Sequence, residues 1–270
     1  MIIRTLAGMV LVPVLIAVFL LVPHFVTALV VGIMAAIASY EMLYRTGLVR
    51  SFRLNVYSAI MAFLVCIWAY FDNSYAAALL GVLLYYIVLF GEMMLSSMKL
   101  SLKTATLCMF SGVVVPFMLS SLLRILMGDN GKFFILIPFV TAFLSDTGAY
   151  FVGVLMGKHK LCPNISPKKT VEGFVGGVVT AIAGMLVYAL ILQKGFDFDV
   201  NYSMALLYGL LGSLCGVFGD LSMSVIKRQV GIKDYGNLIP GHGGILDRFD
   251  SVMITAPLTE VLLLLLPIVV

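Results

Sequence analysis

Long apolar stretches dominate this sequence, and they determine the solvent in which most of the chain folds. Of its 270 residues, 62% are hydrophobic and 11% are charged, whereas soluble domains carry about 25% charged residues. A helix of about twenty apolar residues crosses the roughly 30 Å hydrocarbon core of a bilayer. Nine stretches meet that requirement: 3–22, 25–43, 54–71, 76–95, 104–126, 133–156, 171–192, 202–226 and 251–270. The sequence therefore predicts an all-α polytopic membrane protein with about nine transmembrane helices.

The connections between these stretches divide the cationic residues unequally between the two sides of the membrane. If the spans alternate in direction, fourteen lysines and arginines share one side: Arg4, Arg45, Arg50, Arg53, Lys99, Lys103, Lys158, Lys160, Lys168, Lys169, Lys227, Arg228, Lys233 and Arg248. The other side receives Lys132 and Lys194, with Arg124 near that end of its span. Because cytoplasmic loops carry the excess of lysine and arginine, we expect a protein of the cytoplasmic membrane with a cytoplasmic N-terminus and an outside C-terminus.

Polar residues gather in the second half of the chain. We expect residues 1–130 to form an N-terminal scaffold of five spans, and residues 131–270 to form a catalytic region of four spans. The two long cytoplasmic connections, 157–170 and 227–250, place the chemistry on the cytoplasmic side. The net charge of +4 comes without a basic stripe interleaved with aromatic residues, which argues against a nucleic-acid partner and favours contact with membrane lipid.

Two carboxylates are expected within the membrane, Asp146 in the sixth span and Asp220 in the eighth. At 1.5 Å per residue, Asp146 lies on the order of 15 Å from the cytoplasmic end of its helix. A charged group at that depth needs a partner, a metal or water. The alternative is a protonated aspartic acid that makes a hydrogen bond between packed helices.

The segment between the eighth and ninth spans is the longest polar interruption in the chain. Acids at the start of a helix are expected from capping alone. Paired glycines, however, let backbone approach a ligand closely, and the free N–H groups of a helix start bind phosphate. The candidate site residues of this segment are Lys227, Arg228, Lys233, His242, Gly243, Gly244, Asp247, Arg248 and Asp250.

The connection before the seventh span carries a second possible phosphate site. Ser166 as N-cap and Pro167 at the first helical position predict a helix start there, which directs unsatisfied N–H groups and the cations of Lys168 and Lys169 at one place. A simple cap with lysines that face lipid headgroups is the alternative.

Carboxylates and phosphates repel each other unless divalent cations lie between them. The sequence therefore favours Mg²⁺ held by Asp146, Asp220, Asp247 and Asp250 against a polyphosphate. Lysine and arginine side chains would offset the remaining charge.

These residues resemble the phosphatidate cytidylyltransferases, also called CDP-diacylglycerol synthases. The matching signature residues are Ser224, Lys227, Arg228, Lys233, Asp234, Gly236, Pro240, His242, Gly243, Gly244, Asp247, Arg248 and Asp250. The Ser145-Asp146-Thr147 element and the element from Ser166 to Gly173 are also similar to those of the family. The specific part of the resemblance covers about residues 140–251.

The resemblance implies that CTP and phosphatidate react to CDP-diacylglycerol and pyrophosphate on the cytoplasmic leaflet. It also implies a homodimer and Mg²⁺ dependence, with a monovalent cation such as K⁺ as a further candidate near Asp220 and Asp247. The implied catalytic residues are Asp220, Asp247, Lys227, Arg228, His242 and Arg248. The implied phosphate-binding residues are Lys168, Lys169, Lys233, Gly243 and Gly244. The sequence leaves open whether Lys168 and Lys169 bind CTP or the lipid phosphate.

Two other functions are compatible with parts of this pattern. A CTP-dependent polyprenol kinase would use the same metal chemistry but transfer the γ-phosphate. An ion-coupled transporter would use Asp146 and Asp220 as coupling carboxylates, although it gives no role to the long His-Gly-Gly segment.

Overall fold

The computed structural model describes residues 13–71, 74–95, 100–238 and 243–269. The chain divides into two compact units. Unit 1 comprises Met1–Asp129 and Val230–Arg248, and unit 2 comprises Asn130–Gln229 and Phe249–Val270. The polar segment after residue 230 therefore belongs with the N-terminal helices and not with the helices that flank it in sequence.

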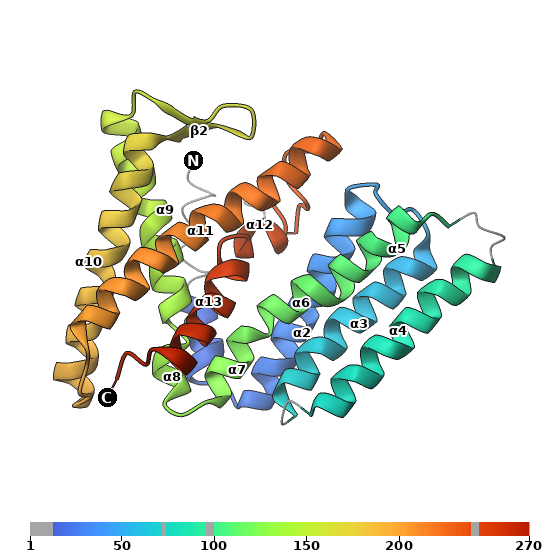
Figure 1. Cartoon of the computed structure of the whole chain (residues 1–270), viewed down its shortest axis with the longest axis horizontal. Coiled ribbons are helices and arrows are strands. Elements are labelled where there is room, and N and C mark those ends of the chain that lie inside the picture. The colour runs from blue at the N-terminus through green and yellow to red at the C-terminus, as the bar shows by residue number, and fades with distance from the viewer. Residues whose placement is uncertain (1–12, 72–73, 96–99, 239–242, 270) are drawn as a thin grey trace. The chain divides into compact units, whose positions relative to one another are not determined.

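Unit 1 consists of packed helices, and its most extensive contact joins the long helices α2 (His24–Tyr40) and α3 (Phe52–Tyr70) (Figure 1). Residues 13–20 are helical, and the elements that follow are α2, the π-helical turn η1 (Glu41–Arg45), α3, α4 (Tyr75–Leu95), α5 (Leu102–Met109), a second π-helical turn η2 (Phe110–Val114), α6 (Val115–Leu119) and α7 (Ser121–Met127). Its buried core joins Leu43 and Val49 to Leu54 of α3 and Leu89 of α4.

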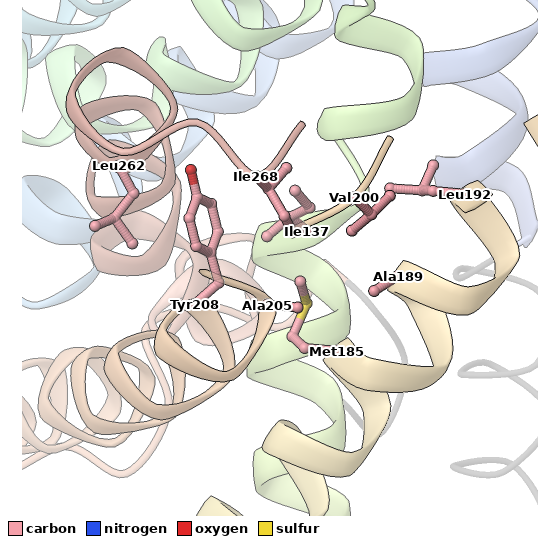
Figure 2. Packing of buried hydrophobic residues seen from close by; sticks show 9 residues of the cluster. All are labelled: Ile137, Met185, Ala189, Leu192, Val200, Ala205, Tyr208, Leu262 and Ile268. Atoms are coloured by element: carbon pink, nitrogen blue, oxygen red, sulfur yellow. The ribbon is translucent and has the colours of Figure 1, made fainter. Parts of the chain in front are cut away.

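Unit 2 contains the longest helices of the described chain. Its elements are α8 (Gly131–Phe134), α9 (Ile137–Met156), the strands β1 (Lys160–Cys162) and β2 (Ser166–Thr170), α10 (Val171–Phe196), α11 (Tyr202–Val230), and α13 (Val252–Leu265). The four-residue helix α12 (Leu246–Phe249) links the two units in sequence. Figure 2 shows the core, where side chains from α9, α10, α11 and α13 meet around Tyr208. The Tyr208 hydroxyl donates to the Leu266 carbonyl at 3.1 Å, which satisfies its buried polar atom.

Within the described residues, seven helical segments are long and apolar enough to cross a membrane. They are His24–Arg45, Phe52–Tyr70, Tyr75–Leu95, Leu102–Met127, Gly131–Met156, Val171–Phe196 and Tyr202–Val230. These match the second to eighth expected spans, so the chain is an integral membrane protein of the all-α class. Residues 3–12, half of the first expected span, lie outside the described residues, and the count of nine stays a prediction.

The ninth expected span, 251–270, is shorter than the apolar pattern predicts. Helix α13 has 14 residues, or about 21 Å, compared with a hydrocarbon core of roughly 30 Å. The chain leaves the helix at Leu266, whose φ is −140°. Val269 then pairs with Val200, and the Asn201 N–H donates to the Ile268 carbonyl at 2.9 Å. Tertiary hydrogen bonds therefore end the helix before the apolar sequence ends.

The expected helix start at Ser166 and Pro167 is wrong. Residues Ser166–Thr170 form strand β2, antiparallel to β1, and α10 begins at Val171. Thr170 is the N-cap, because its hydroxyl accepts the Gly173 N–H at 3.1 Å. Proline suits an edge strand as well as a helix start, so Ser166 and Pro167 alone did not distinguish the two. Lys168 and Lys169 consequently lie on a strand, where Lys168 is exposed and Lys169 is partly buried.

Helices α9 and α10 lie side by side and approach each other through small residues (Figure 1). A Cβ atom added at Gly177 would lie 2.6 Å from the Ser145 carbonyl oxygen, and one added at Gly173 would lie 2.7 Å from the Ala149 carbonyl oxygen. Small residues allow such backbone contact between membrane helices, where close packing replaces the hydrophobic effect. Glycine at these positions therefore sets the spacing of the two helices.

We expect Gly177→Ala to destabilise the protein by about 1–3 kcal/mol, because the added methyl group forces α9 and α10 apart. Gly195→Ala, near the C-terminal end of α10, is the matched control, since a Cβ atom added at Gly195 meets nothing within 4 Å. The measurement is the thermal unfolding midpoint of the purified protein in detergent. Equal midpoints for the two variants would contradict the close packing of α9 against α10.

Candidate active site

Asp250, which precedes α13, lies near enough to two other carboxylates of unit 2 to feel their charges: Asp220 of α11 and Asp146 of α9. Asp250 is buried, and a Cβ atom added at Gly219 would lie 2.5 Å from its carbonyl oxygen. Burial raises the pKa of Asp250, which lies outside the seven long spans, and the negative charges of Asp220 and Asp146 raise it further. The fold therefore gathers acidic side chains at one place and favours the neutral form of Asp250.

Lysine side chains balance part of this charge. Lys169 of β2 forms an ion pair with Asp220, and both side chains are about one-quarter exposed. Lys227 is buried on α11, and its positive charge lowers the pKa of Asp250, opposing the effect of burial. The strand that replaced the expected helix start thus brings a cation directly to a carboxylate of α11.

A cavity of about 420 Å³ in unit 2 is lined by Lys169 of this ion pair, together with other charged and apolar residues. Its charged lining comes from Asp146, Lys160, Lys168 and Lys169. The rest of the lining is mainly apolar: Ala149, Tyr150, Gly153, Val154, Leu161, Thr170, Gly173, Phe174 and Val217. A cavity lined by both lysines and apolar side chains can accept a molecule that has an anionic head and an apolar body.

The β1–β2 hairpin is held to the start of α10 and to the end of α11. The Glu172 carboxylate accepts the backbone N–H of Lys158 at 3.1 Å and lies 2.6 Å from Nδ1 of His159. The Arg228 Nε donates to the Ile165 carbonyl at 3.1 Å. Arg228, expected to offset phosphate charge, therefore also supports the hairpin that carries Lys168 and Lys169.

The remaining described candidates belong to unit 1. The Asp247 Oδ2 accepts the backbone N–H of Tyr235 at 2.8 Å and that of Gly244 at 3.0 Å. Gly243 has a φ of +84°, a conformation that favours glycine, and a Cβ atom there would lie 2.7 Å from the Asp247 Oδ2. Lys233 and Arg248 are exposed. Asp247 therefore organises its own loop, a role that the metal interpretation had not included.

The structure assigns the candidates to two groups. Unit 2 holds Asp146, Lys168, Lys169, Asp220, Lys227, Arg228 and Asp250, and unit 1 holds Lys233, Gly243, Gly244, Asp247 and Arg248. His242 lies outside the described residues.

The sequence of this chain matches a known protein family over nearly its whole length. The model of the cytidylyltransferase family matches residues 2–266. This chain belongs to the cytidylyltransferase family.

Curated bacterial relatives support the assignment. A phosphatidate cytidylyltransferase of Staphylococcus haemolyticus is 42% identical over 179 residues, 66% of each chain. One of Staphylococcus epidermidis is 48% identical over 136 residues, 50% of this chain and 51% of the relative. One of Staphylococcus aureus is 44% identical over 172 residues, 63% of each chain. The aligned segments thus span less than two thirds of the length of these relatives.

The donor atoms of this cytidylyltransferase fit Mg²⁺ in kind. Among the described residues, no group of three or more His, Cys, Asp or Glu side chains forms a metal cluster. Mg²⁺ bound with a nucleotide usually takes one or two protein carboxylates and completes its coordination with phosphates and water. Asp220 and Asp250, whose charges interact, are candidates for that smaller number of ligands.

Sequence reasoning passed over Glu41, which lies in what was expected to be a scaffold. Glu41 is buried at 3% exposure, and its carboxylate accepts the backbone N–H groups of Ile245 at 3.1 Å and Leu246 at 3.0 Å. The available signal was an acidic residue within an otherwise apolar span, a placement that usually indicates function.

We expect Glu172→Ala to speed hydrogen exchange in the peptides that cover residues 158–170. The change removes the acceptor for the Lys158 N–H and the partner of the His159 ring, so the hairpin opens more often. Hydrogen-exchange mass spectrometry of the detergent-solubilised protein measures this. Glu92→Ala in unit 1 is the control, and equal exchange rates in the two variants would show that Glu172 does not secure the hairpin.

Proposed function

We propose that this cytidylyltransferase transfers CMP from CTP to phosphatidate, which yields CDP-diacylglycerol and pyrophosphate. The observation that carries the proposal is the cavity of unit 2, whose lining combines charged and apolar side chains and includes Lys169, the ion-pair partner of Asp220. The names of the aligned relatives agree with it. The reaction needs a site where a lipid phosphate meets a nucleotide, and this cavity has the lining for the lipid phosphate.

In the proposed reaction, an oxygen of the phosphatidate phosphate attacks the α-phosphorus of CTP. The bond from the α-phosphorus to the oxygen that bridges it to the β-phosphate breaks, and pyrophosphate leaves with that electron pair. The nucleophile is already an anion, so no covalent enzyme intermediate is required. The main task of the protein is to hold two polyanions together and to stabilise the charge that develops on the leaving group.

The cavity lining supports assigning Lys168 and Lys169 to the phosphatidate phosphate. Both lysines border the cavity, and its apolar lining includes Val154, Phe174 and Val217. An acyl glycerol body fits these apolar side chains, whereas the ribose and triphosphate of CTP would leave polar groups without partners there. Phosphatidate binding would displace Lys169 from Asp220 and so free the carboxylate.

The other signature residues are assigned within each unit separately. Lys227 is proposed to offset charge beside Asp250 in unit 2, and Lys233, His242 and Arg248 are proposed to offset phosphate charge in unit 1. Gly243 and Gly244 remain proposed nucleotide-binding residues on the strength of the family resemblance, although their open faces meet Asp247 and Glu41. We propose that Asp146, Asp220 and Asp250, and separately Asp247, provide ligands for Mg²⁺, and that a monovalent cation such as K⁺ is a further candidate. Bound Mg²⁺ would neutralise phosphate charge.

The location of the site follows from the charge pattern. We propose that the N-terminus and the active site face the cytoplasm and that the C-terminus lies outside, because the lysines and arginines concentrate on one side of the alternating spans. A homodimer in the cytoplasmic membrane remains part of the proposal on the strength of the family resemblance.

Labelled CTP tests the reaction and separates it from γ-phosphate transfer. With Mg²⁺ and phosphatidate, the wild-type protein is expected to move label from the α-phosphate into lipid and to leave the γ-label in pyrophosphate. Asp247→Asn is expected to lower the rate at least about a hundredfold. The asparagine amide oxygen can still accept the loop N–H groups, so the loss reports the missing charge.

Asp129→Asn, an exposed position in unit 1, is the control and is expected to keep full activity. Label from the γ-phosphate in lipid would instead indicate a lipid kinase. Full activity of Asp247→Asn would remove Asp247 from the proposed machinery.

Lys169 provides a separate test of lipid binding. We expect Lys169→Gln to raise KM for phosphatidate by about tenfold and to change KM for CTP by no more than about twofold, because one charge-assisted hydrogen bond to the lipid phosphate is lost. Lys194→Gln, at the other end of α10, is the control. Initial rates in mixed micelles at varied phosphatidate and CTP measure both constants. A larger change in KM for CTP would reassign Lys169 to the nucleotide.

A further inference from the structure

Glu41 is a buried acid in the part of the chain expected to be a scaffold. It is 3% exposed, and it lies within the span His24–Arg45 as the first residue of the π-helical turn η1. Ionisable residues within membrane spans need partners and are usually functional, and π-helical turns in α-helices are frequent at functional sites. Helical packing within unit 1 does not by itself account for an acid at this position.

The partners of Glu41 are backbone groups in the polar segment. The Glu41 Oε1 accepts the Ile245 N–H at 3.1 Å, and the Oε2 accepts the Leu246 N–H at 3.0 Å, across a sequence separation of 204 and 205 residues. The first N–H groups of a helix have no partner within the helix. Glu41 thus satisfies two donors where α12 begins, one with each carboxylate oxygen.

Two glycines of the signature segment fit around the same carboxylate. A Cβ atom added at Gly236 or Gly244 would overlap the Glu41 carboxylate, and the one at Gly236 would also lie 3.1 Å from the Gly244 Cα. Gly244 does not have a positive φ, so its backbone conformation would tolerate a side chain. The space occupied by Glu41 is the reason for glycine at position 244.

Gly244 also connects Glu41 to a proposed catalytic carboxylate. Its Cα faces Glu41, while its N–H donates to the Asp247 Oδ2 at 3.0 Å. The same Oδ2 accepts the Tyr235 N–H. The orientation of Asp247 therefore depends on the backbone at Gly244, and Glu41 holds the two residues that follow Gly244.

We infer that Glu41 is a positioning residue for the reaction: it fixes the described parts of the loop from Tyr235 to Leu246 and thereby orients Asp247. This inference rests on the proposed function. A carboxylate is suited to the role because it accepts two N–H groups, whereas a glutamine amide accepts with its oxygen and points N–H donors at the second group.

The first experiment compares Glu41→Gln with Glu92→Gln in the full-length protein. Glu92 is the control because it lies in the same unit and pairs with Arg53 at 3.3 Å. Glu41→Gln is expected to lower kcat by about tenfold to a hundredfold, as misplaced catalytic groups do. KM for phosphatidate should stay within about twofold, because the lysines assigned to the lipid belong to unit 2.

The second experiment is a double-mutant cycle that does not depend on how well Glu41→Gln folds. Gly244→Ala is expected to reduce activity through overlap with Glu41, and Glu41→Asp withdraws the carboxylate by one methylene group. The double variant should therefore be at least about fivefold more active than the product of the single effects predicts. Purely additive effects would overturn the inference.

The two hypotheses fail in different ways. A wild-type protein that forms no CDP-diacylglycerol would refute the proposed function. An active wild type with a Glu41→Gln variant of unchanged kcat would refute the role of Glu41 alone. A loss of kcat accompanied by a large rise in KM for phosphatidate would also overturn it, because that pattern indicates general disruption and not the orientation of Asp247.

Discussion

The partnering of buried and partly buried carboxylates is the constraint on which the site of this protein depends. An ionised acid surrounded by lipid and apolar side chains is costly unless its charge is met by a cation or by hydrogen-bond donors. In unit 2, the carboxylate of Asp220 forms an ion pair with the ammonium group of Lys169. In unit 1, the carboxylates of Glu41 and Asp247 accept hydrogen bonds from backbone N–H groups. The mobile charge of a lysine can be displaced by a substrate, whereas backbone donors hold one geometry.

Close helix packing makes the ion pair between Lys169 and Asp220 possible. Gly173 and Gly177 bring α10 into backbone contact with α9, and Thr170 caps α10 at the end of β2. The strand is therefore held where Lys169 reaches Asp220 of α11. A change in the helix spacing would move the hairpin and the charged lining of the cavity together, so the packing of α9 and α10 and the chemistry of the site are linked.

Hydropathy predicted most of the fold because a bilayer requires long apolar helices. It overestimated the final helix, which hydrogen bonds near Val269 end early. The expected helix start at Ser166 was wrong because proline fits an edge strand equally well. Glu41 was missed for another reason: its partners are backbone N–H groups more than 200 residues away, and backbone donors leave no signal in a sequence.

The sequence by itself determined the solvent, the helical class, and the residue types available for phosphate and metal chemistry. These follow from composition and short spacings, which act locally along the chain. Only the tertiary structure decided that Lys169 pairs with Asp220 and that Glu41 supports the loop of Asp247. Such pairings depend on distances between atoms far apart in the chain, and those distances are set by how the helices pack.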